Sequence, residues 1–290
     1  METHMSVQAE PLVPFLAEPS RNGAEISVTG KWIPSRPDGW FWKSAESEQM
    51  RQEWEDIHAE AKADPGVLST EINHAVGEDA VLVHHVFANA DAVGDYFATT
   101  ATEHMAALTS VARPELHMVR GASIPDNVQQ AITSKGVPAA FGEHLFGYVK
   151  HDYRQPDPAT AINVTAKWTC TPDGTLDELR YWWQKVGTDA YTLEEGLVRV
   201  EAYQVAGENA LIIHEAFENT DTLKFHLTKG TADRYKKDID AIAAPEAYFF
   251  RGPVSWTIRT YSKFMHLPAT YSRRGSHFTA PGGSMSDGTV

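Results

Sequence analysis

The stretch ALIIHEAFENTDTLKFHL, residues 210–227, has the same design as AVLVHHVFANADAVGDYF, residues 80–97. Each begins with an apolar run that contains two adjacent polar residues, His84 and His85 in one copy, His214 and Glu215 in the other. Each continues through a short polar turn into a segment whose apolar residues recur at helical spacing. The chain therefore contains a strand–turn–helix unit twice.

The repetition extends along most of the chain. ISVTGKW at 26–32 corresponds to INVTAKW at 162–168, and PELHMVRG at 114–121 corresponds to PEAYFFRG at 245–252. Between them the same residues recur at equivalent places: Glu71 and Glu201, Gly77 and Gly207, Phe87 and Phe217, Asn89 and Asn219. We therefore divide the sequence into an N-terminal extension (1–25), a first repeat (26–150), a linker (151–160), a second repeat (161–278) and a flexible tail (279–290).

Strand and helix patterns alternate in the same order in both repeats. Each repeat opens with a β-branched run typical of a strand, followed by a segment with helical periodicity. In the second repeat this segment is TLDELRYWWQKVGTDAY. It is expected to begin with a capping box of Thr175 and Glu178 and to bury a stripe that includes Leu179, Trp182 and Val186.

Two strands, a second helix and a last strand follow. A GED or GEN turn separates two apolar runs, which predicts a hairpin in each repeat. Asp91 and Asp221 are expected to cap one long helix after the hairpin. ELHMVRG or EAYFFRG then supplies the last strand, so the predicted order is βαββαβ in each repeat.

That order is typical of the ferredoxin-like unit, a four-stranded antiparallel sheet with two helices on one face. The other face has to be covered, and a second copy in the same chain can cover it. The extended segments PAAFGEHLFGYVK and PATYSRRGSHF, which follow the last strands, could then reach across to the other repeat. We therefore predict an α+β fold in which two ferredoxin-like βαββαβ repeats form an internal pseudo-dimer.

Composition disfavours several classes of function. The chain has 39 acidic against 25 basic residues and a net charge of −14, so nucleic-acid and anionic-membrane partners are not expected. The single cysteine, Cys170, excludes an internal disulfide and a cysteine-built metal site. No apolar run approaches the ~18 residues of a membrane span, and the first residues lack the basic region of a signal peptide. We expect a cytoplasmic protein that acts on a small molecule.

HEAFENTDTLKFHLTKG, residues 214–230, resembles the strand-to-helix signature of the antibiotic biosynthesis monooxygenase family. The shared features are a Glu-x-aromatic strand end, a short acidic turn and a helix that begins with His-Leu. Members of that family pair one such unit per chain into a dimeric α+β barrel. The resemblance covers both repeats and implies a fused, intrachain version of that barrel, either as a monomer with an internal pseudo-dimer or as a homodimer.

The resemblance also implies a site between the sheet and helices of the second repeat. The strand glutamate of the family becomes Glu215, its aromatic residue Phe217 and its histidine His226. We predict His226 as the base or orienting group and Glu215 as its polar partner. The first repeat departs from the pattern, with His85 and Tyr96 at two of the three places and Phe87 retained. The predicted substrate-binding residues are Phe217, Trp168, Asn163, Glu201, Tyr203, His214, Phe87, Tyr96 and His85.

Several of these residues also have structural interpretations. Adjacent strand residues face opposite ways, so His214 and Glu215 serve different faces, and His214, which recurs as His84, suits the seam between the repeats. Glu71 and Glu201 could form buried pairs with a histidine or with an arginine such as Arg120 or Arg251. No metal site is expected, because a carboxylate ligand beside the histidines cannot be placed.

Haem is not expected as a cofactor either. The haem-degrading branch of the family uses an asparagine on the first strand, a tryptophan and an axial histidine on the second helix. Asn163 could be that asparagine, but Ser27 replaces it in the first repeat. His104 lies on the second helix of the first repeat and has no counterpart in the second.

The predicted function is cofactor-independent monooxygenation of a small aromatic, quinol or polyketide-like hydroxy compound, with molecular oxygen as co-substrate. A base removes the hydroxyl proton, and the resulting anion can pass an electron to dioxygen. One alternative is an isomerase or cyclase that uses the same acid–base pair without oxygen. The other is a non-catalytic protein that binds small molecules or acts in a stress response.

Overall fold

The computed structural model describes residues 24–37, 44–150, 157 and 159–279. The first half of the chain comprises β1 (Ile26–Pro34), α1 (Ala45–Ala61), β2 (Val67–Ala75), β3 (Val81–Phe87), α2 (Ala90–Ala98), α3 (Thr100–Val111), β4 (Ala112–Gly121), α4 (Asp126–Thr133) and β5 (Ala139–Val149). The second half comprises β6 (Ile162–Cys170), α5 (Leu176–Leu193), β7 (Leu197–Val205), β8 (Ala210–Phe217), α6 (Thr220–Thr228), α7 (Thr231–Ile242), β9 (Ala243–Arg251), α8 (Trp256–Phe264) and β10 (Ala269–Thr279).

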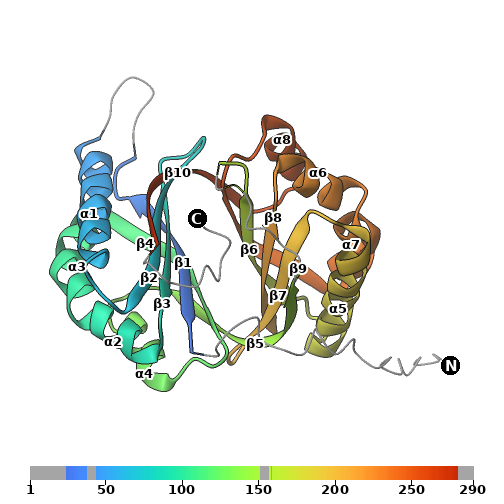
Figure 1. The fold of residues 1–290 in the computed structure, drawn as a ribbon, viewed down its shortest axis with the longest axis horizontal. Helices are drawn as coiled ribbons and strands as arrows, with labels where there is room; N and C mark the ends of the chain where they lie inside the picture. Colours follow the sequence, from blue (N-terminus) through green and yellow to red (C-terminus); the bar gives the residue numbers. More distant parts are fainter. Residues whose placement is uncertain (1–23, 38–43, 151–156, 158, 280–290) are drawn as a thin grey trace.

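The strands form one closed barrel in the order β1-β3-β2-β10-β9-β6-β8-β7-β5-β4. The helices of the two halves lie on opposite outer sides of it (Figure 1). Each half contributes a four-stranded antiparallel sheet, β4-β1-β3-β2 and β9-β6-β8-β7, as the ferredoxin-like prediction requires. The predicted α+β barrel within one chain is therefore confirmed.

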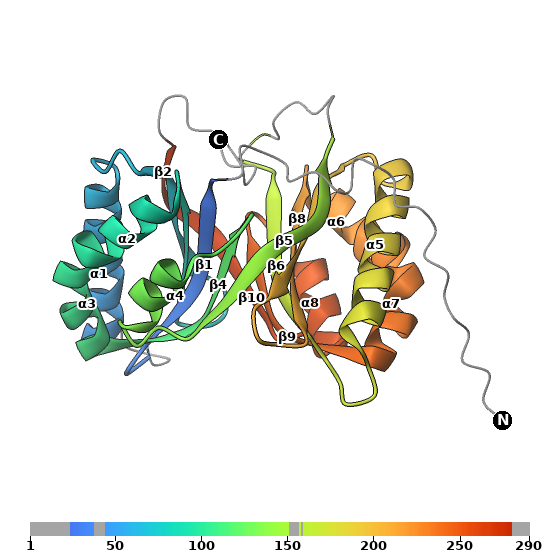
Figure 2. The same cartoon turned by 90° about the horizontal axis from the view of Figure 1, so that it is seen from below.

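Strands β5 and β10 connect the halves. Strand β5 runs parallel to β4 of its own half and antiparallel to β7 of the other, and Figure 2 shows it crossing between them. Strand β10 does the same with β9 and β2. The extended segments thus reach across as predicted, and every strand that the structure describes has a neighbour on both sides.

The two faces of a strand pack against different parts of the protein. On β8, Leu211, Ile213 and Phe217 pack toward the helices of the second half, whereas Ile212 packs toward the barrel interior. The interior cluster draws residues from both halves, among them Leu82 and Phe249. Because both faces are buried, the period-2 alternation separates a helix side, where a pocket can form, from a sealed interior.

The second helix of each repeat differs from the prediction. It is broken in two, as α2 and α3 in the first half and as α6 and α7 in the second. Asn89 and Asn219, rather than Asp91 and Asp221, are the N-caps of α2 and α6, and their side chains accept hydrogen bonds from backbone N–H groups. Asparagine and aspartate are equally good N-cap residues, and each asparagine lies two residues before the predicted aspartate. The residue types alone therefore did not determine where the helix begins.

The first helix of the second half follows the prediction at its start and departs from it inside. The capping box of Thr175 and Glu178 on α5 is confirmed. Trp183, however, is buried together with Leu179 and Val186, while Trp182 is only partly buried. Residues three and four positions after Leu179 both lie on the same side of the helix. The residue that is buried is Trp183, four positions after Leu179.

An ion pair joins the halves inside the barrel. Arg251 on β9 donates to Glu71 on β2 at 2.7 Å, and both side chains are almost fully buried, as the sequence suggested. Burial alone raises the pKa of the Glu71 carboxyl, but the nearby Arg251 and other cationic groups hold it below its usual value. Stability that depends on this carboxylate is therefore present above its ordinary pKa and is lost as the pH falls through the lowered one.

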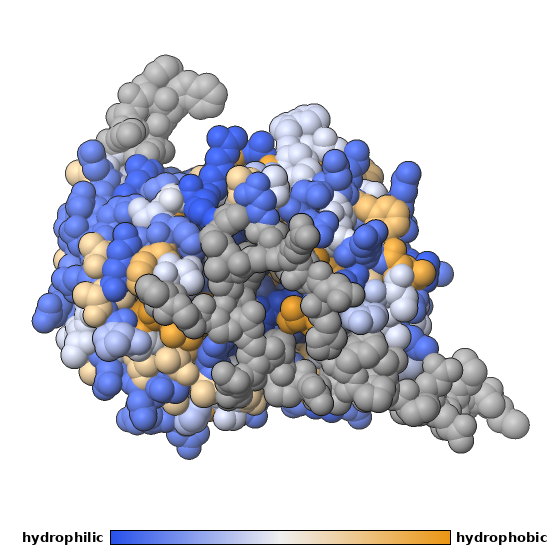
Figure 3. Space-filling view, viewed as in Figure 1, coloured by the Kyte–Doolittle hydropathy of each residue, from blue (hydrophilic) through white to orange (hydrophobic). Residues whose placement is uncertain are grey.

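The outer surface is mostly polar. On the face shown in Figure 3, hydrophilic side chains cover much of the described surface on both sides of the barrel. The exposed large apolar side chains of the described residues are Leu193, Phe225, Trp256 and Phe264. None of the described helices is long and apolar enough to cross a membrane. Most of the predicted extension, linker and tail, namely residues 1–23, 151–156, 158 and 280–290, lies outside the described residues.

We expect Glu71→Gln to lower the free energy of unfolding by about 3–5 kcal/mol, because Arg251 would stay buried without its carboxylate. Denaturant unfolding followed by tryptophan fluorescence would measure this. Arg234→Gln is the control, since it removes an exposed ion pair with Asp189 and should cost less than about 1 kcal/mol. Equal effects of the two substitutions would contradict the structural role assigned to the buried pair.

Candidate active site

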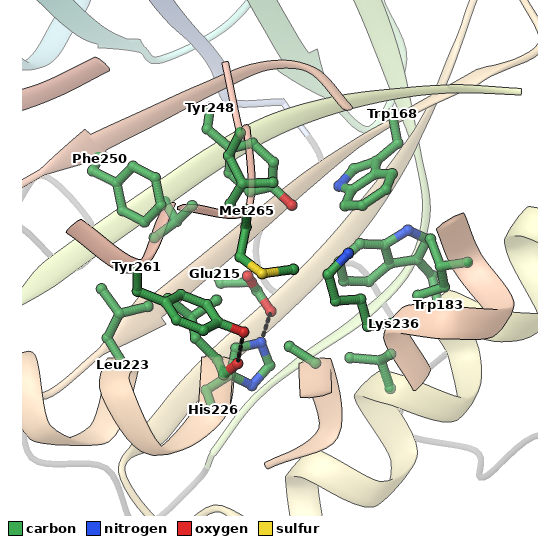
Figure 4. A pocket seen from close by; sticks show the side chains of 16 residues that line it. Trp168, Trp183, Glu215, Leu223, His226, Lys236, Tyr248, Phe250, Tyr261 and Met265 are labelled. Atoms are coloured by element: carbon green, nitrogen blue, oxygen red, sulfur yellow. Dashed lines mark hydrogen bonds and ion pairs between the residues drawn. The ribbon is translucent and has the colours of Figure 1, made fainter. Parts of the chain in front are cut away.

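A pocket lies in the second half between the sheet and helices α5 to α8 (Figure 4). Its cavity volume is about 60 Å³. One buried water needs about 10–15 Å³, so the cavity has room for a small organic group. Strands β6, β8 and β9 form its floor. Its lining residues are Val164, Trp168, Trp183, Val186, Glu215, Leu223, His226, Leu227, Ala232, Lys236, Ile239, Tyr248, Phe250, Tyr261, Met265 and Leu267.

A histidine between two carboxylates is the polar centre of this pocket. His226 on α6 lies with Nδ1 2.9 Å from Glu194 Oε2 and with Nε2 3.2 Å from Glu215 Oε1. Glu194 comes from the connection between α5 and β7, and Glu215 from β8. The histidine and Glu194 are almost completely shielded from solvent. The hydrogen bond to Glu194 is well aligned, whereas Glu215 Oε1 makes only an ion-pair contact.

The break between α6 and α7 holds Glu194 in place. Glu194 Oε1 accepts hydrogen bonds from the Thr231 backbone N–H at 2.6 Å and from its hydroxyl at 2.7 Å, at the N-terminus of α7. The unpaired N–H groups and the dipole of a helix N-terminus favour a carboxylate there. A Cβ on Gly230 would lie 2.6 Å from Glu194 Oε1, so the close approach needs glycine at this position.

The two carboxylates keep His226 protonated. Burial alone lowers the pKa of the imidazole, but the charge of the nearby Glu215, together with the hydrogen bond to Glu194 and the charge of that carboxylate, raises it to about 10. Burial likewise raises the pKa of Glu194, while His226 and Thr231 bring it below its usual value. At neutral pH the site therefore holds an imidazolium between a positioned carboxylate and a carboxylate that faces the pocket.

Aromatic side chains form most of the remaining wall. Trp168 packs edge-on against Trp183 with ring centroids 5.8 Å apart and against Tyr248 at 5.9 Å. Tyr261 on α8 donates its hydroxyl proton to the Leu227 carbonyl oxygen at 2.9 Å and so ties α8 to α6 beside His226. A flat apolar ring with a polar substituent is the kind of ligand that such a pocket accommodates.

The structure brings together four of the residues predicted from the sequence. His226, Glu215 and Trp168 line the pocket, and the Phe217 ring lies behind His226 with centroids 5.3 Å apart. Asn163, Glu201, Tyr203 and His214 lie elsewhere, because their positions on β6, β7 and β8 face the barrel interior. His214 contacts the Thr165 hydroxyl at 3.1 Å, and Glu201 accepts hydrogen bonds from Arg199 and Tyr203.

The corresponding residues of the first half gather in a different environment. His85, Phe87 and Tyr96 pack with ring centroids 5.2 to 6.0 Å apart, with Trp54 beside His85 at 6.1 Å. Burial lowers the pKa of His85 to about 3 and raises that of Tyr96, so both side chains are neutral at neutral pH. The two positions that carry the Glu215–His226 ion pair in the second half thus carry no charge in the first.

Several lining residues were not predicted from the sequence. Lys236 lies on α7, Tyr261 lies on α8, and Met265 follows the end of α8. Helix α8 itself was not predicted. Glu194 was missed because it belongs to a loop, although it stands two residues before Gly196 just as Asp64 stands before Gly66. An acidic residue at that place in both repeats was the available signal.

No group of three or more histidine, cysteine, aspartate or glutamate side chains among the described residues could hold a metal ion. The histidine that a haem site would use is already engaged. His104 on α3 contacts Glu53 at 3.1 Å and Glu60 at 3.2 Å, both on α1. It therefore faces the neighbouring helix, and its environment does not fit an axial haem ligand.

Neither a protein-family model nor a curated protein sequence matches the chain. The fold has counterparts among solved structures. A proposed monooxygenase from Fusobacterium nucleatum superposes with a TM-score of 0.52 at 12% identity, over 78% of this chain and 91% of the other. An anthrone oxidase-like protein gives a TM-score of 0.50 at 10% identity, over 89% and 94%. These structures confirm the resemblance at the level of the fold.

We expect Glu194→Gln to lower the pKa of His226 by about one to three pH units, because it removes one of the two charges that stabilise the imidazolium. Titration of the imidazole signals by nuclear magnetic resonance would measure the pKa. Glu195→Gln, next to it but exposed, should leave the pKa near 10. An unchanged titration in Glu194→Gln would show that Glu194 does not hold the proton on His226.

We expect His85→Phe to make the first half more resistant to acid. A histidine in the unfolded chain has a pKa of about 6.5, whereas His85 in the folded protein stays neutral down to a much lower pH. Below about pH 6.5 the unfolded chain therefore binds one more proton than the folded protein, and the free energy of unfolding falls with the pH. Removing the group should reduce this loss by about 1.4 kcal/mol per pH unit. Denaturant unfolding at a series of pH values would measure it, and an unchanged slope would contradict the prediction.

Proposed function

We propose that the second-half pocket oxidises a small hydroxyaromatic compound, such as a phenol, a quinol or a polyketide-like hydroxy compound, with molecular oxygen and without a cofactor. One observation carries the proposal. Glu215 faces an aromatic-walled pocket 3.2 Å from an imidazole that Glu194 helps to keep protonated. The counterparts in the fold that are described as monooxygenase or oxidase-like agree with it, although their similarity concerns the fold alone.

In this proposal Glu215 is the base and His226 the stabilising cation. With a pKa of about 10 the imidazole already carries both protons at neutral pH and has no lone pair to accept another. Glu215 takes the hydroxyl proton of the substrate, and the Nε2–H of His226 then donates to the phenolate oxygen. Glu194 acts as a positioning residue, because it orients the imidazole ring and favours its charged form.

The reaction needs no external reductant. The phenolate passes one electron to dioxygen, and the two radicals combine at a ring carbon that bears a hydrogen, which forms a hydroperoxide. Loss of the ring proton and cleavage of the O–O bond leave a carbonyl on that carbon. One oxygen atom enters the product and the other leaves as water, which takes the ring proton and the proton that Glu215 returns.

The same pair of residues also suits a reaction without oxygen. A carboxylate in contact with an imidazolium can move a proton from one carbon of a substrate to another, as an isomerase or a cyclase requires. Turnover under anaerobic conditions separates the two reactions. A protein that only binds small molecules would give neither oxygen uptake nor anaerobic turnover.

We expect Glu215→Gln to lower oxygen uptake by about a hundredfold or more, which is the usual contribution of a general base. An oxygen electrode with metal-free protein and a panel of hydroxylated aromatics and quinols would measure it. Glu218→Gln, an exposed carboxylate in the next turn of the chain, should retain full activity. Equal activity of wild type and Glu215→Gln, or equal turnover without oxygen, would refute the proposed reaction.

A further inference from the structure

The pocket has a second polar region that the proposed chemistry does not use. Lys236 on α7 and Trp183 on α5 lie together at one side of the pocket, whereas Glu215 and His226 lie at another (Figure 4). Aromatic and aliphatic side chains, among them Tyr248, complete the lining. The pocket therefore has a side with Glu215 and a side with Lys236.

The indole rings of Trp183 and Trp168 pack edge-on against each other at this side, and both carry buried N–H groups. The Trp183 indole nitrogen is buried and makes no hydrogen bond within the described part of the chain. The same holds for the Trp168 indole nitrogen, whose approach to the Tyr248 hydroxyl lacks hydrogen-bond geometry. Buried donors without an acceptor are rare in native structures, and each one needs an explanation. Two of them beside a lysine are explained by an acceptor that comes with the ligand.

Lys236 is available for such a ligand at little cost. Within the part of the chain that the structure describes, it forms an ion pair with Asp240, one turn further along α7, and both side chains are partly exposed. Pairs of this kind on a helix surface are weak and exchange partners readily. A carboxylate of the ligand would gain charge-assisted hydrogen bonds from Lys236 in a less solvated place.

We propose that Lys236, together with the indole N–H groups of Trp183 and Trp168, forms a subsite for a carboxylate of the substrate. The inference rests on the proposed function and narrows its substrate class to hydroxyaromatic carboxylic acids. The hydroxyl points to Glu215 and the carboxylate points to Lys236. The reverse orientation would place the substrate carboxylate against Glu215, where like charges repel each other.

Binding of para-hydroxybenzoate and of its methyl ester tests the subsite. Isothermal titration calorimetry under anaerobic conditions measures binding without turnover, so the result does not depend on the oxygenase reaction. Wild type should bind the acid about tenfold more tightly than the ester. Lys236→Met should lose this preference, and Lys236→Arg should restore most of it. Lys237→Met, an exposed neighbour outside the pocket lining, should keep it.

Two results would overturn the subsite. One is that wild type shows no preference for the acid over the ester, including the case in which neither compound binds. The other is that Lys236→Met weakens the acid and the ester equally, which would assign Lys236 a merely structural role. Oxygen uptake with either compound distinguishes the failures. If the protein prefers the acid but takes up no oxygen, the subsite stands and the oxygenase reaction is refuted. If it takes up oxygen but shows no preference for the acid, the oxygenase reaction stands and the subsite is refuted.

Discussion

Strands β5 and β10 each pair with both halves of the chain, and the rest of the structure depends on this exchange. A four-stranded sheet alone would leave two open edges and one uncovered apolar face. The exchanged strands close the edges, and closure seals the inner faces against each other. Polar groups on the inner faces then have to satisfy one another, as Glu71 and Arg251 do across the two halves.

The closed barrel also determines which strand residues line the pocket. On β8, His214 faces inward and contacts Thr165, whereas Glu215 lines the pocket on the helix side. There, burial makes every charge costly unless another charge offsets it. Strand β5 contributes to the same electrostatic balance, because the charges of Glu215 and Glu194 add to burial in raising the pKa of its Tyr148.

Much of the fold followed from local patterns in the sequence. These patterns depend on residues close together in the sequence, so they can be recognised without the tertiary structure. They are the repeat, the period-2 alternation on β8, the hairpins and the capping box of Thr175. The break between α6 and α7 was not predictable in the same way. It arises where the chain turns at Gly230 to bring the N-terminus of α7 onto Glu194, a residue from a loop far away in sequence.

The candidate site shows the same division. Glu215 and His226 were predicted from the family resemblance of the strand-to-helix segment, and Trp168 from the end of a strand that recurs in the first repeat. Residues that alternate along a strand lie on the same face of the sheet, but which face lies under the helices depends on the tertiary structure. For this reason four residues were assigned to a pocket that they do not line: His214, Glu201, Tyr203 and Asn163. The shift from Trp182 to Trp183 reflects the small angular difference between helical spacings of three and four residues.

Fusion of two units in one chain gives a freedom that a homodimer lacks. In a homodimer every residue that suits a reaction occurs twice, together with the cost of burying its charge. Here the second half has three charged groups in one cluster, Glu194, Glu215 and His226 itself. The places of Glu215 and His226 are taken in the first half by the neutral His85 and Tyr96. The first half can pack those positions as an aromatic core, which stabilises the shared barrel, while the second keeps an open pocket. The two halves therefore share one scaffold but differ in charge at these equivalent positions.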